Sequence, residues 1–373
     1  MKYYLIAGEA SGDLHGANLM SQLKARDGDA HFRFWGGDLM QAEGGTLVKH
    51  YKDLAFMGFA EVITNLRTIL NNIAFCKKDI LEFEPDVIIY IDYPGFNLRI
   101  AKWAKRNGLA NHYYISPQIW AWKEGRIKAI KRDIDAMYVI LPFEKTFYEK
   151  GHQFPVEFVG HPLIDAIVTR DQIHPDEFRS FYGLDERPII ALLPGSRKQE
   201  ISKILKVMLS ITSHFPQHQF VIAGAPGLDE SFYTRFIQDQ NVKFLQNKTY
   251  DLLSVSTAAL VTSGTATLET ALFKVPQVVC YKGSRISYEI AKRVIHLKYI
   301  SLVNLILNKP AVTELIQSEF NTKRLKEELS KILDDYQRAV LFLDYYDLEN
   351  ELGGRGASAK TAQHIVDTIM PVQ

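Results

Sequence analysis

Cysteine is scarce in this 373-residue sequence, and neither sign of charge dominates it. Cys76 and Cys280 are the only cysteines, and they lie in unrelated segments without a metal-ligand spacing around them. This usage predicts a reduced, intracellular protein without a disulfide framework. The 44 basic residues nearly cancel the 43 acidic ones, which disfavours a dedicated nucleic-acid binder.

Long apolar runs are also missing. No apolar stretch is long enough to span a bilayer, and the apolar residues 3–7 come too early to leave room for a signal peptide. We therefore expect neither secretion nor a transmembrane helix. With 47% hydrophobic residues and no long polar tract, the chain should be globular throughout and, at this length, should form two domains.

Short apolar runs alternate with glycine-bearing loops and helical patterns in both halves, which predicts an α/β protein. The expected strands are residues 3–7, 87–91, 112–116, 137–141 and 156–159, then 188–193, 220–223, 242–245, 258–262 and 275–281. We expect two facing Rossmann-like domains, at residues 1–168 and 169–340. In the remaining segment, 341–373, the last helix should cross back to the first domain.

Residues 258–269 combine a buried strand, a Ser263-Gly264-Thr265 turn and a helix that begins there. The free amides and the dipole of a first helical turn favour an anionic phosphate. Glu269 lies one turn further along, on the same face as Thr265, where a carboxylate suits ribose hydroxyls. The alternative is an ordinary capped helix with a solvated glutamate.

The loop Pro194-Gly195-Ser196-Arg197 follows the strand at 188–193. An arginine at such a strand end can clamp a diphosphate through two hydrogen bonds, whereas a lysine would act only as a point charge. The loop therefore pairs with the turn at Ser263 as a candidate nucleotide site in the second half.

Residues 8–13, Gly-Glu-Ala-Ser-Gly-Asp, follow the first strand and lack the Gly-x-Gly-x-x-Gly pattern of dinucleotide-binding loops. Two carboxylates, Glu9 and Asp13, together with a serine and exposed amides, suit sugar hydroxyls better than a pyrophosphate. The alternative is a capped turn with Asp13 near the start of a helix.

Asp92 ends the continuous apolar run 87–91, which is typical of a central strand in a parallel sheet. Ligands of open parallel sheets bind at the carboxyl ends of the strands, so Asp92 is a candidate catalytic acid. The alternative is an aspartate that only caps the loop.

Aromatic and basic residues gather in two further stretches. Trp120 and Trp122 stand in a stretch that we expect to be non-helical, where they either stack on sugar rings or pack the loop onto the body. The basic helix from Lys123 is either a solvated face or a neighbour of phosphate or an anionic bilayer. Residues 54–75 predict a core helix, although Phe56, Met57 and Phe59 in the loop before it would suit a membrane surface. His214 and His218 lie four apart without a third metal ligand, which favours a surface role.

Eight motifs follow one another in order along most of the chain. They are residues 8–13, Met57–Val62, Ile91–Asn97, Ser116–Trp122, Leu141–Glu144, Leu192–Arg197, Ser263–Glu269 and Ser301–Asn304. Together they resemble the bacterial lipid-A-disaccharide synthases, whose architecture is the GT-B glycosyltransferase fold. The resemblance implies an inverting, metal-independent reaction without a cofactor. It transfers 2,3-diacylglucosamine from UDP to the 6-hydroxyl of 2,3-diacylglucosamine 1-phosphate (lipid X), giving the β-1,6 lipid A disaccharide 1-phosphate and UDP.

The resemblance also implies roles for individual residues, with Asp92 as the base. On the acceptor side it places Glu9, Ser11, Gly12, Asp13, Trp120, Trp122 and Asn304, and on the nucleotide side Ser196, Arg197, Ser263, Gly264, Thr265 and Glu269. The family acts on the cytoplasmic face of the inner membrane and exchanges C-terminal segments in a homodimer, so Asn304 would serve the partner's site.

Two departures from the family pattern bear on these roles. Gly95 stands where many relatives have an acid, which narrows the choice of base to Asp92, and Val303 replaces the usual proline before Asn304. Competing hypotheses are a soluble UDP-sugar glycosyltransferase, a UDP-N-acetylglucosamine 2-epimerase and a non-catalytic nucleotide-sugar sensor.

Overall fold

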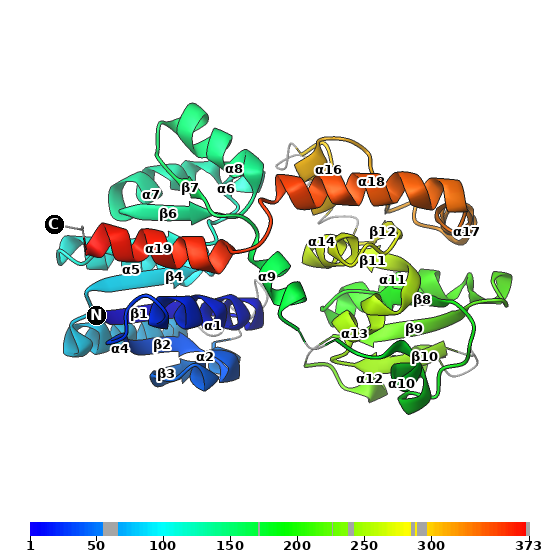
Figure 1. Ribbon diagram of the computed structural model, residues 1–373, viewed down its shortest axis with the longest axis horizontal. Coiled ribbons are helices and arrows are strands. Elements are labelled where there is room, and N and C mark those ends of the chain that lie inside the picture. Colours follow the sequence, from blue (N-terminus) through cyan, green and yellow to red (C-terminus); the bar gives the residue numbers. More distant parts are fainter. Residues whose placement is uncertain are drawn as a thin grey trace. The chain divides into compact units, whose positions relative to one another are not determined.

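A computed structural model of the chain describes residues 1–54, 66–170, 172–225, 227–237, 242–284, 288 and 297–370. The loop with Phe56, Met57 and Phe59 lies outside these residues. The chain forms two compact units (Figure 1). The first comprises Met1–Ala166 and Leu352–Gln373, and the second comprises Ile167–Glu351.

The first unit is built on a seven-stranded parallel sheet with the order β3-β2-β1-β4-β5-β6-β7. Its strands are β1 (Lys2–Ala7), β2 (His31–Gly36), β3 (Thr46–His50), β4 (Val87–Ile91), β5 (Asn111–Tyr114), β6 (Ala136–Val139) and β7 (Glu157–Phe158). Its helices are α1 (Ala10–Lys24), α2 (Asp38–Ala42), α4 (Leu66–Phe83), α5 (Pro94–Arg106), α6 (Ile119–Trp122), α7 (Ile127–Asp133), α8 (Pro142–Thr146) and α19 (Ala357–Ile369). Short 3-10 helices form η1 (Tyr51–Asp53) and η2 (Glu124–Arg126), and a π-helix forms η3 (Phe147–Gly151). Helix α9 (Pro162–Val168) leads into the second unit.

The second unit holds a six-stranded parallel sheet with the order β10-β9-β8-β11-β12-β13. Its strands are β8 (Ile189–Leu193), β9 (Gln219–Gly224), β10 (Val242–Gln246), β11 (Ser256–Thr262), β12 (Gln277–Tyr281) and β13 (Thr313–Ile316). Its helices are α10 (Pro175–Phe181), α11 (Lys198–Leu209), α12 (Glu230–Ile237), α13 (Thr249–Ser254), α14 (Thr265–Leu272), α16 (Leu302–Leu307), α17 (Thr322–Ile332) and α18 (Asp335–Glu351), with the short turn η4 (Thr212–His214).

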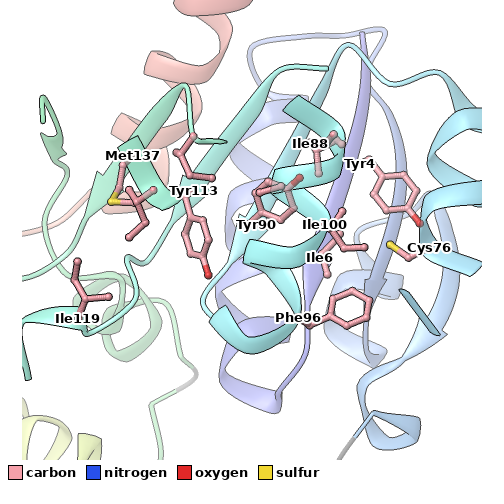
Figure 2. Packing of buried hydrophobic residues seen from close by; sticks show 14 of the residues in the cluster. Tyr4, Ile6, Cys76, Ile88, Tyr90, Phe96, Ile100, Tyr113, Ile119 and Met137 are labelled. Atoms are coloured by element: carbon pink, nitrogen blue, oxygen red, sulfur yellow. The ribbon is translucent and has the colours of Figure 1, made fainter. Parts of the chain in front are cut away.

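Strand β1 shows why both faces of the first sheet are apolar. Successive side chains of a strand point to opposite faces. Tyr4 and Ile6 therefore join a cluster with α4 and α5, where they meet Cys76 and Phe96 (Figure 2). The alternate residues of β1 join a second cluster that includes α1 and α19. A parallel strand covered on both faces needs the continuous apolar run that the sequence shows.

The chain returns to the first unit later than residue 341. Helix α18 is continuous from Asp335 to Glu351. Its buried Tyr345 packs in the second unit, where the Tyr345 hydroxyl accepts a hydrogen bond from the Gln277 amide at 3.4 Å. An ion pair between Lys274 and Glu349, with 2.6 Å between nitrogen and oxygen, also holds α18 against the second unit. The first unit therefore resumes at Leu352, and α19 then packs beside α1 (Figure 1).

Three further local expectations differ from the structure. Helix α1 begins at Ala10, so most of the expected 8–13 loop is its first turn, with Glu9 as the residue before it. The tryptophan stretch forms the short helix α6 instead of an extended loop. Strands β2, β3 and β13 lie in segments for which we expected no strand, because they carry weaker apolar runs than the central strands.

Both sheets reverse their strand order at one point. In the first sheet β1 lies between β2 and β4, and in the second β8 lies between β9 and β11. At such a point neighbouring connections leave toward opposite faces of the sheet, and ligands bind in the crevice outside the strand ends. The loops after β1 and β4, and those after β8 and β11, are therefore the places where each unit can hold a ligand.

Candidate active site

Asp92 stands at the end of β4 in an unusual backbone conformation. Asp92 and Tyr93 both have left-handed backbones, with φ of 43° and 48°. Such residues cost about 1–3 kcal/mol each and persist where their surroundings hold them. Here the Asp92 carbonyl accepts hydrogen bonds from the Asn97 amide at 2.7 Å and the Tyr113 hydroxyl at 2.6 Å. The fold therefore fixes the Asp92 backbone at the expected ligand position.

The loop after β1 approaches Asp92 closely. A Cβ added at Gly8 would lie 2.4 Å from the Tyr93 ring, so only a glycine lets these two loops meet. This contact brings Glu9 close enough to influence Asp92. Burial, followed by the negative charge of Glu9, raises the pKa of Asp92 from 3.8 to about 6, and a hydrogen bond involving the Tyr93 backbone opposes the rise. A carboxylate with this pKa is ionised at pH 7 and more basic than usual, as a general base requires.

Glu9→Gln should move the acid limb of the pH–rate profile to lower pH. The base acts when deprotonated, so the rate falls as the pH falls through about 6, the pKa of Asp92. Removing the Glu9 charge eases ionisation of Asp92, which lowers that pKa. The measurement is the midpoint of kcat/KM against pH. Ser11→Ala, in the first turn of α1, changes no charge and should keep the wild-type midpoint. A wild-type midpoint in Glu9→Gln would contradict the coupling.

Asp13 forms hydrogen bonds within the first unit that the sequence does not indicate. Its carboxylate is 3% exposed and accepts hydrogen bonds from the backbone N–H groups of Gly37 at 2.7 Å, Met40 at 3.0 Å and Leu39 at 3.1 Å. It therefore caps α2 and holds the β2–α2 loop against α1, and it has no free face for a sugar. Its neighbour Gly12 is also buried, against β1.

The two tryptophans of α6 differ in their surroundings. Trp120 is partly buried and donates its indole N–H to Glu144 at 3.0 Å, so it is packed onto the body of the first unit. Trp122 is 53% exposed, and the Lys123 ammonium lies 3.9 Å from its ring centroid. Only Trp122 has most of its ring open to solvent.

The second unit contains a cavity of about 510 Å³ at the carboxyl ends of its central strands. It is lined by Leu193, Gly195, Ser196, Arg197, Glu200, Ala223, Ala225, Thr249, Thr262, Ser263, Gly264, Thr265, Ala266, Glu269 and Tyr281. All six residues expected on the nucleotide side are among them, so the structure brings this set together. The cavity lies at the point where the strand order reverses between β8 and β11.

The start of α14 provides anion-binding groups in this cavity. Gly264, with φ of 149°, precedes the helix and has no side chain that could cap its first amides. These amides are available to an oxyanion. The Ser263 hydroxyl donates to the Ile300 carbonyl at 2.7 Å, so it fastens the turn before α16 to this site. Arg197 is 70% exposed and pairs with Glu200 at 3.3 Å, which leaves its guanidinium accessible.

Glu269 lines the same cavity one turn further along α14. Burial raises its pKa, and a hydrogen bond from the Tyr250 hydroxyl, at 2.9 Å to Oε1, opposes the rise. Tyr250 fixes one carboxylate oxygen and leaves the other without a hydrogen bond within the protein, among the residues that the structure describes.

Asn304 does not lie open to a substrate. It is 1% exposed, and its amide donates to the Val312 carbonyl and to Glu314, both at 2.9 Å, while its oxygen accepts from the Val312 N–H at 2.9 Å. Glu314 in turn accepts from the backbone N–H groups of Ile300 and Ser301. Asn304 therefore supports the turn that Ser263 contacts, and its role in substrate binding stays a prediction.

Several residues of these sites were absent from the sequence-based set. Asn97 and Tyr113 hold the Asp92 carbonyl, Tyr250 holds Glu269, and Glu144 holds Trp120. Asn97 and Glu144 belong to motifs that the sequence shows, but nothing in their spacing indicates which atoms they meet. Within the described ranges, no three His, Cys, Asp or Glu side chains gather as they would around a metal ion.

Solved structures of other proteins share the fold of this chain. A UDP-GlcNAc 2-epimerase from Neisseria meningitidis, bound to UDP-GlcNAc, has a TM-score of 0.68 and 14% identity, over 98% of this chain and 100% of its own. The S. aureus MnaA–UDP co-structure has a TM-score of 0.71 and 12% identity, over 100% and 97%. The glycotransferase of kitacinnamycin has a TM-score of 0.67 and 13% identity, over 99% of both chains. At these identities the likeness shows the fold: two Rossmann-like domains of GT-B type, as expected.

Sequence comparisons assign the chain to one family within this fold. The model of the lipid-A-disaccharide synthetase family matches residues 3–366. Relatives named lipid-A-disaccharide synthase are 37% identical in Trichlorobacter lovleyi, over 98% of this chain and 97% of theirs, and 40% identical in Syntrophus aciditrophicus, over 96% and 95%. The chain belongs to the lipid-A-disaccharide synthetase family and is a glycosyltransferase of lipid A biosynthesis, so the resemblance stated from its motifs is confirmed.

Proposed function

We propose that the chain transfers 2,3-diacylglucosamine from UDP to the 6-hydroxyl of lipid X with inversion at the anomeric carbon. The observation that carries this proposal is the position of Asp92 at the strand-order reversal of the first sheet, on a backbone held by Asn97 and Tyr113. Its raised pKa, about 6, supports the same role. A base of this strength can take the proton of a hydroxyl as that hydroxyl attacks. Membership of the family supports the choice of substrates.

Each unit has its own part in the proposed step. On the first unit, the Asp92 carboxylate accepts the proton of the 6-hydroxyl, whose oxygen bonds to the anomeric carbon of the donor. The bond from that carbon to the β-phosphate oxygen breaks, and its electrons leave with UDP. On the second unit, Arg197 and the first amides of α14 stabilise the charge that develops on the leaving diphosphate. Glu269 accepts a hydrogen bond from the ribose.

The test is a substrate-dependence assay of the purified protein. We expect UDP release when UDP-2,3-diacylglucosamine and lipid X are both present, and only background release with either alone. Conversion of UDP-N-acetylglucosamine without an acceptor would instead identify an epimerase. Binding of UDP without turnover of any of these substrates would identify a nucleotide-sugar sensor, and either result would reject the proposed reaction.

We further propose that the first unit works at the cytoplasmic face of the inner membrane. None of the helices in the described part of the chain combines the length and hydropathy that a membrane crossing requires. Helix α4, however, exposes Leu70 by 57% and Leu81 by 54%. Their spacing places them on one face, together with Arg67, Lys77 and Lys78, which suits an anionic bilayer surface.

Leu70→Ser combined with Leu81→Ser should weaken binding to anionic vesicles by about tenfold or more, because each leucine contributes on the order of 1.5 kcal/mol when buried in lipid. Sedimentation with phosphatidylglycerol vesicles measures the effect, and the melting temperature checks the fold. Leu343→Ser is the matched control, since Leu343 is 68% exposed on α18 of the second unit. Equal sedimentation of the double variant and the control would reject α4 as the contact.

A further inference from the structure

Glu144 is a buried carboxylate that the proposed chemistry does not use. It stands in the first turn of α8, just after β6, and is 1% exposed. Its Oε1 accepts hydrogen bonds from the Ser116 hydroxyl at 2.7 Å and the Trp120 indole N–H at 3.0 Å. Its Oε2 accepts from the backbone N–H groups of Leu141 at 3.0 Å and Ile140 at 3.2 Å. Three of these four partners can only donate, which suits a carboxylate with both oxygens accepting.

Residues 115–120, which include the Ser116 and Trp120 that Glu144 contacts, are held by several further interactions. Ile115 has a left-handed backbone, with φ of 63°, which is strained for a β-branched residue. The Tyr148 hydroxyl donates to the Pro117 carbonyl at 3.2 Å. Ile119 is 1% exposed and belongs to the core cluster (Figure 2). Trp120 and Phe143 pack edge to face, with their ring centroids 4.8 Å apart.

Helix α6 and Asp92 lie at the same edge of the first sheet. Asp92 follows β4, Ser116 follows β5, and Glu144 follows β6, and these three strands are parallel neighbours. The groups that act on Asp92 are Glu9 from the loop after β1, the Tyr93 backbone and Glu144, whose negative charge adds to the rise in the pKa of Asp92. The carboxylate that holds Trp120 therefore also acts electrostatically on the base.

We propose that Glu144 is a positioning residue that holds the Trp120 indole, at the edge of the sheet that carries Asp92, as an aromatic wall for the acceptor's sugar ring. This inference rests on the proposed function, because it assigns the acceptor to the first unit. Aromatic faces suit the apolar faces of sugar rings, but only where the ring is held in place. A buried carboxylate that accepts the indole N–H, while itself held by two backbone amides, supplies that restraint.

The main variant is Glu144→Gln. The new amide group must replace either Oε1 or Oε2, and in each case it faces at least one N–H that needs an acceptor. We expect KM for lipid X to rise about tenfold or more, because small misplacements of a binding surface are costly. The acid limb of kcat/KM should move to lower pH as the charge is lost. The affinity for UDP, measured by calorimetry, should not change.

Trp120→Phe and Glu157→Gln complete the set. Trp120→Phe keeps the Glu144 charge, so KM for lipid X should rise while the acid limb stays in place. Glu157→Gln makes the same exchange at an exposed position of β7 and should match the wild type in both measurements. The fluorescence difference between each protein and its Trp120→Phe derivative reports the surroundings of Trp120 without any turnover.

Unchanged KM and unchanged Trp120 fluorescence in a folded Glu144→Gln would overturn the proposal. If Glu144→Gln does not fold, Trp120→Phe decides, since an unchanged KM for lipid X there removes the aromatic wall. If the wild type transfers nothing to lipid X, the proposed function fails. Quenching of Trp120 fluorescence by lipid X then still tests whether this surface binds it, and no quenching would reject the inference separately.

Discussion

Asp92→Asn should lower turnover by roughly 100- to 10,000-fold, the usual contribution of a general base. The affinity for UDP should not change, because the cavity assigned to UDP lies wholly in the second unit. Asparagine matches aspartate in shape and tolerates a left-handed backbone better than most residues, so the φ of 43° is preserved. The measurements are kcat from UDP release and the Kd of UDP from calorimetry.

The same variant should be more stable than the wild type above pH 6. The pKa of Asp92 is raised in the folded state, so its stabilising contribution is present below the unfolded-state pKa and is lost as the pH rises through about 6. A shift from 3.8 to about 6 corresponds to about 3 kcal/mol at pH 8. A neutral asparagine avoids this cost. Denaturant unfolding at pH 8 and pH 4 should show the gain only at pH 8.

Asp29→Asn is the matched control for both measurements. Asp29 is exposed and precedes β2, at the opposite edge of the sheet from Asp92, so its substitution should alter neither kcat nor the pH dependence of stability. Full activity in Asp92→Asn would remove Asp92 as the base. Loss of UDP affinity together with turnover would indicate a wider structural disturbance.

Arg197→Ala should weaken UDP binding by about 10- to 100-fold, since a hydrogen bond to a charged group contributes on the order of 1.5–3 kcal/mol. Arg197 lines the cavity and is 70% exposed, so its guanidinium is free to reach a diphosphate without leaving a buried ion pair. The catalytic rate should fall as well, because charge builds on the diphosphate as the bond breaks. The measurements are the Kd of UDP and kcat.

Two substitutions define what Arg197 contributes. Arg197→Lys keeps the charge but loses the planar pair of donors, so its affinity for UDP should lie between those of the wild type and Arg197→Ala. Lys198→Ala removes a positive charge from the next residue, which does not line the cavity, and should retain wild-type affinity. Equal losses in Lys198→Ala and Arg197→Ala would indicate a general effect of charge instead of a specific contact.

The nucleotide side could be predicted further from the sequence than the acceptor side. Arg197 and the turn at Ser263 directly follow strands with strong apolar runs, so the position of their backbone follows from the position of the strand. The loops that follow parallel strands lie at one edge of the sheet, however far apart the strands are in the sequence. The position of Asp92 at the end of β4 could be predicted for the same reason.

The hydrogen-bond partners of Asp13 and Asn304 could not be predicted from the sequence. Each is a polar residue beside a glycine-bearing or helical segment, and each satisfies buried backbone groups outside its own helix. Buried amides and carbonyls need partners, and the short side chains of aspartate and asparagine often supply them. Which amides need a partner depends on the packing of β2 and β13, the strands that the sequence indicated least.

The crossing of α19 gives the two units different folding histories. Ala362 and Ile365 lie in the same apolar cluster as Leu5 and Ile89, although the whole second unit separates them along the chain. On the ribosome, β1 and β4 emerge long before the helix that covers this face, while every part of the second unit follows in one stretch. The second unit is therefore built from one continuous segment, whereas the unit that holds Asp92 can complete its core only after α19 has been synthesised.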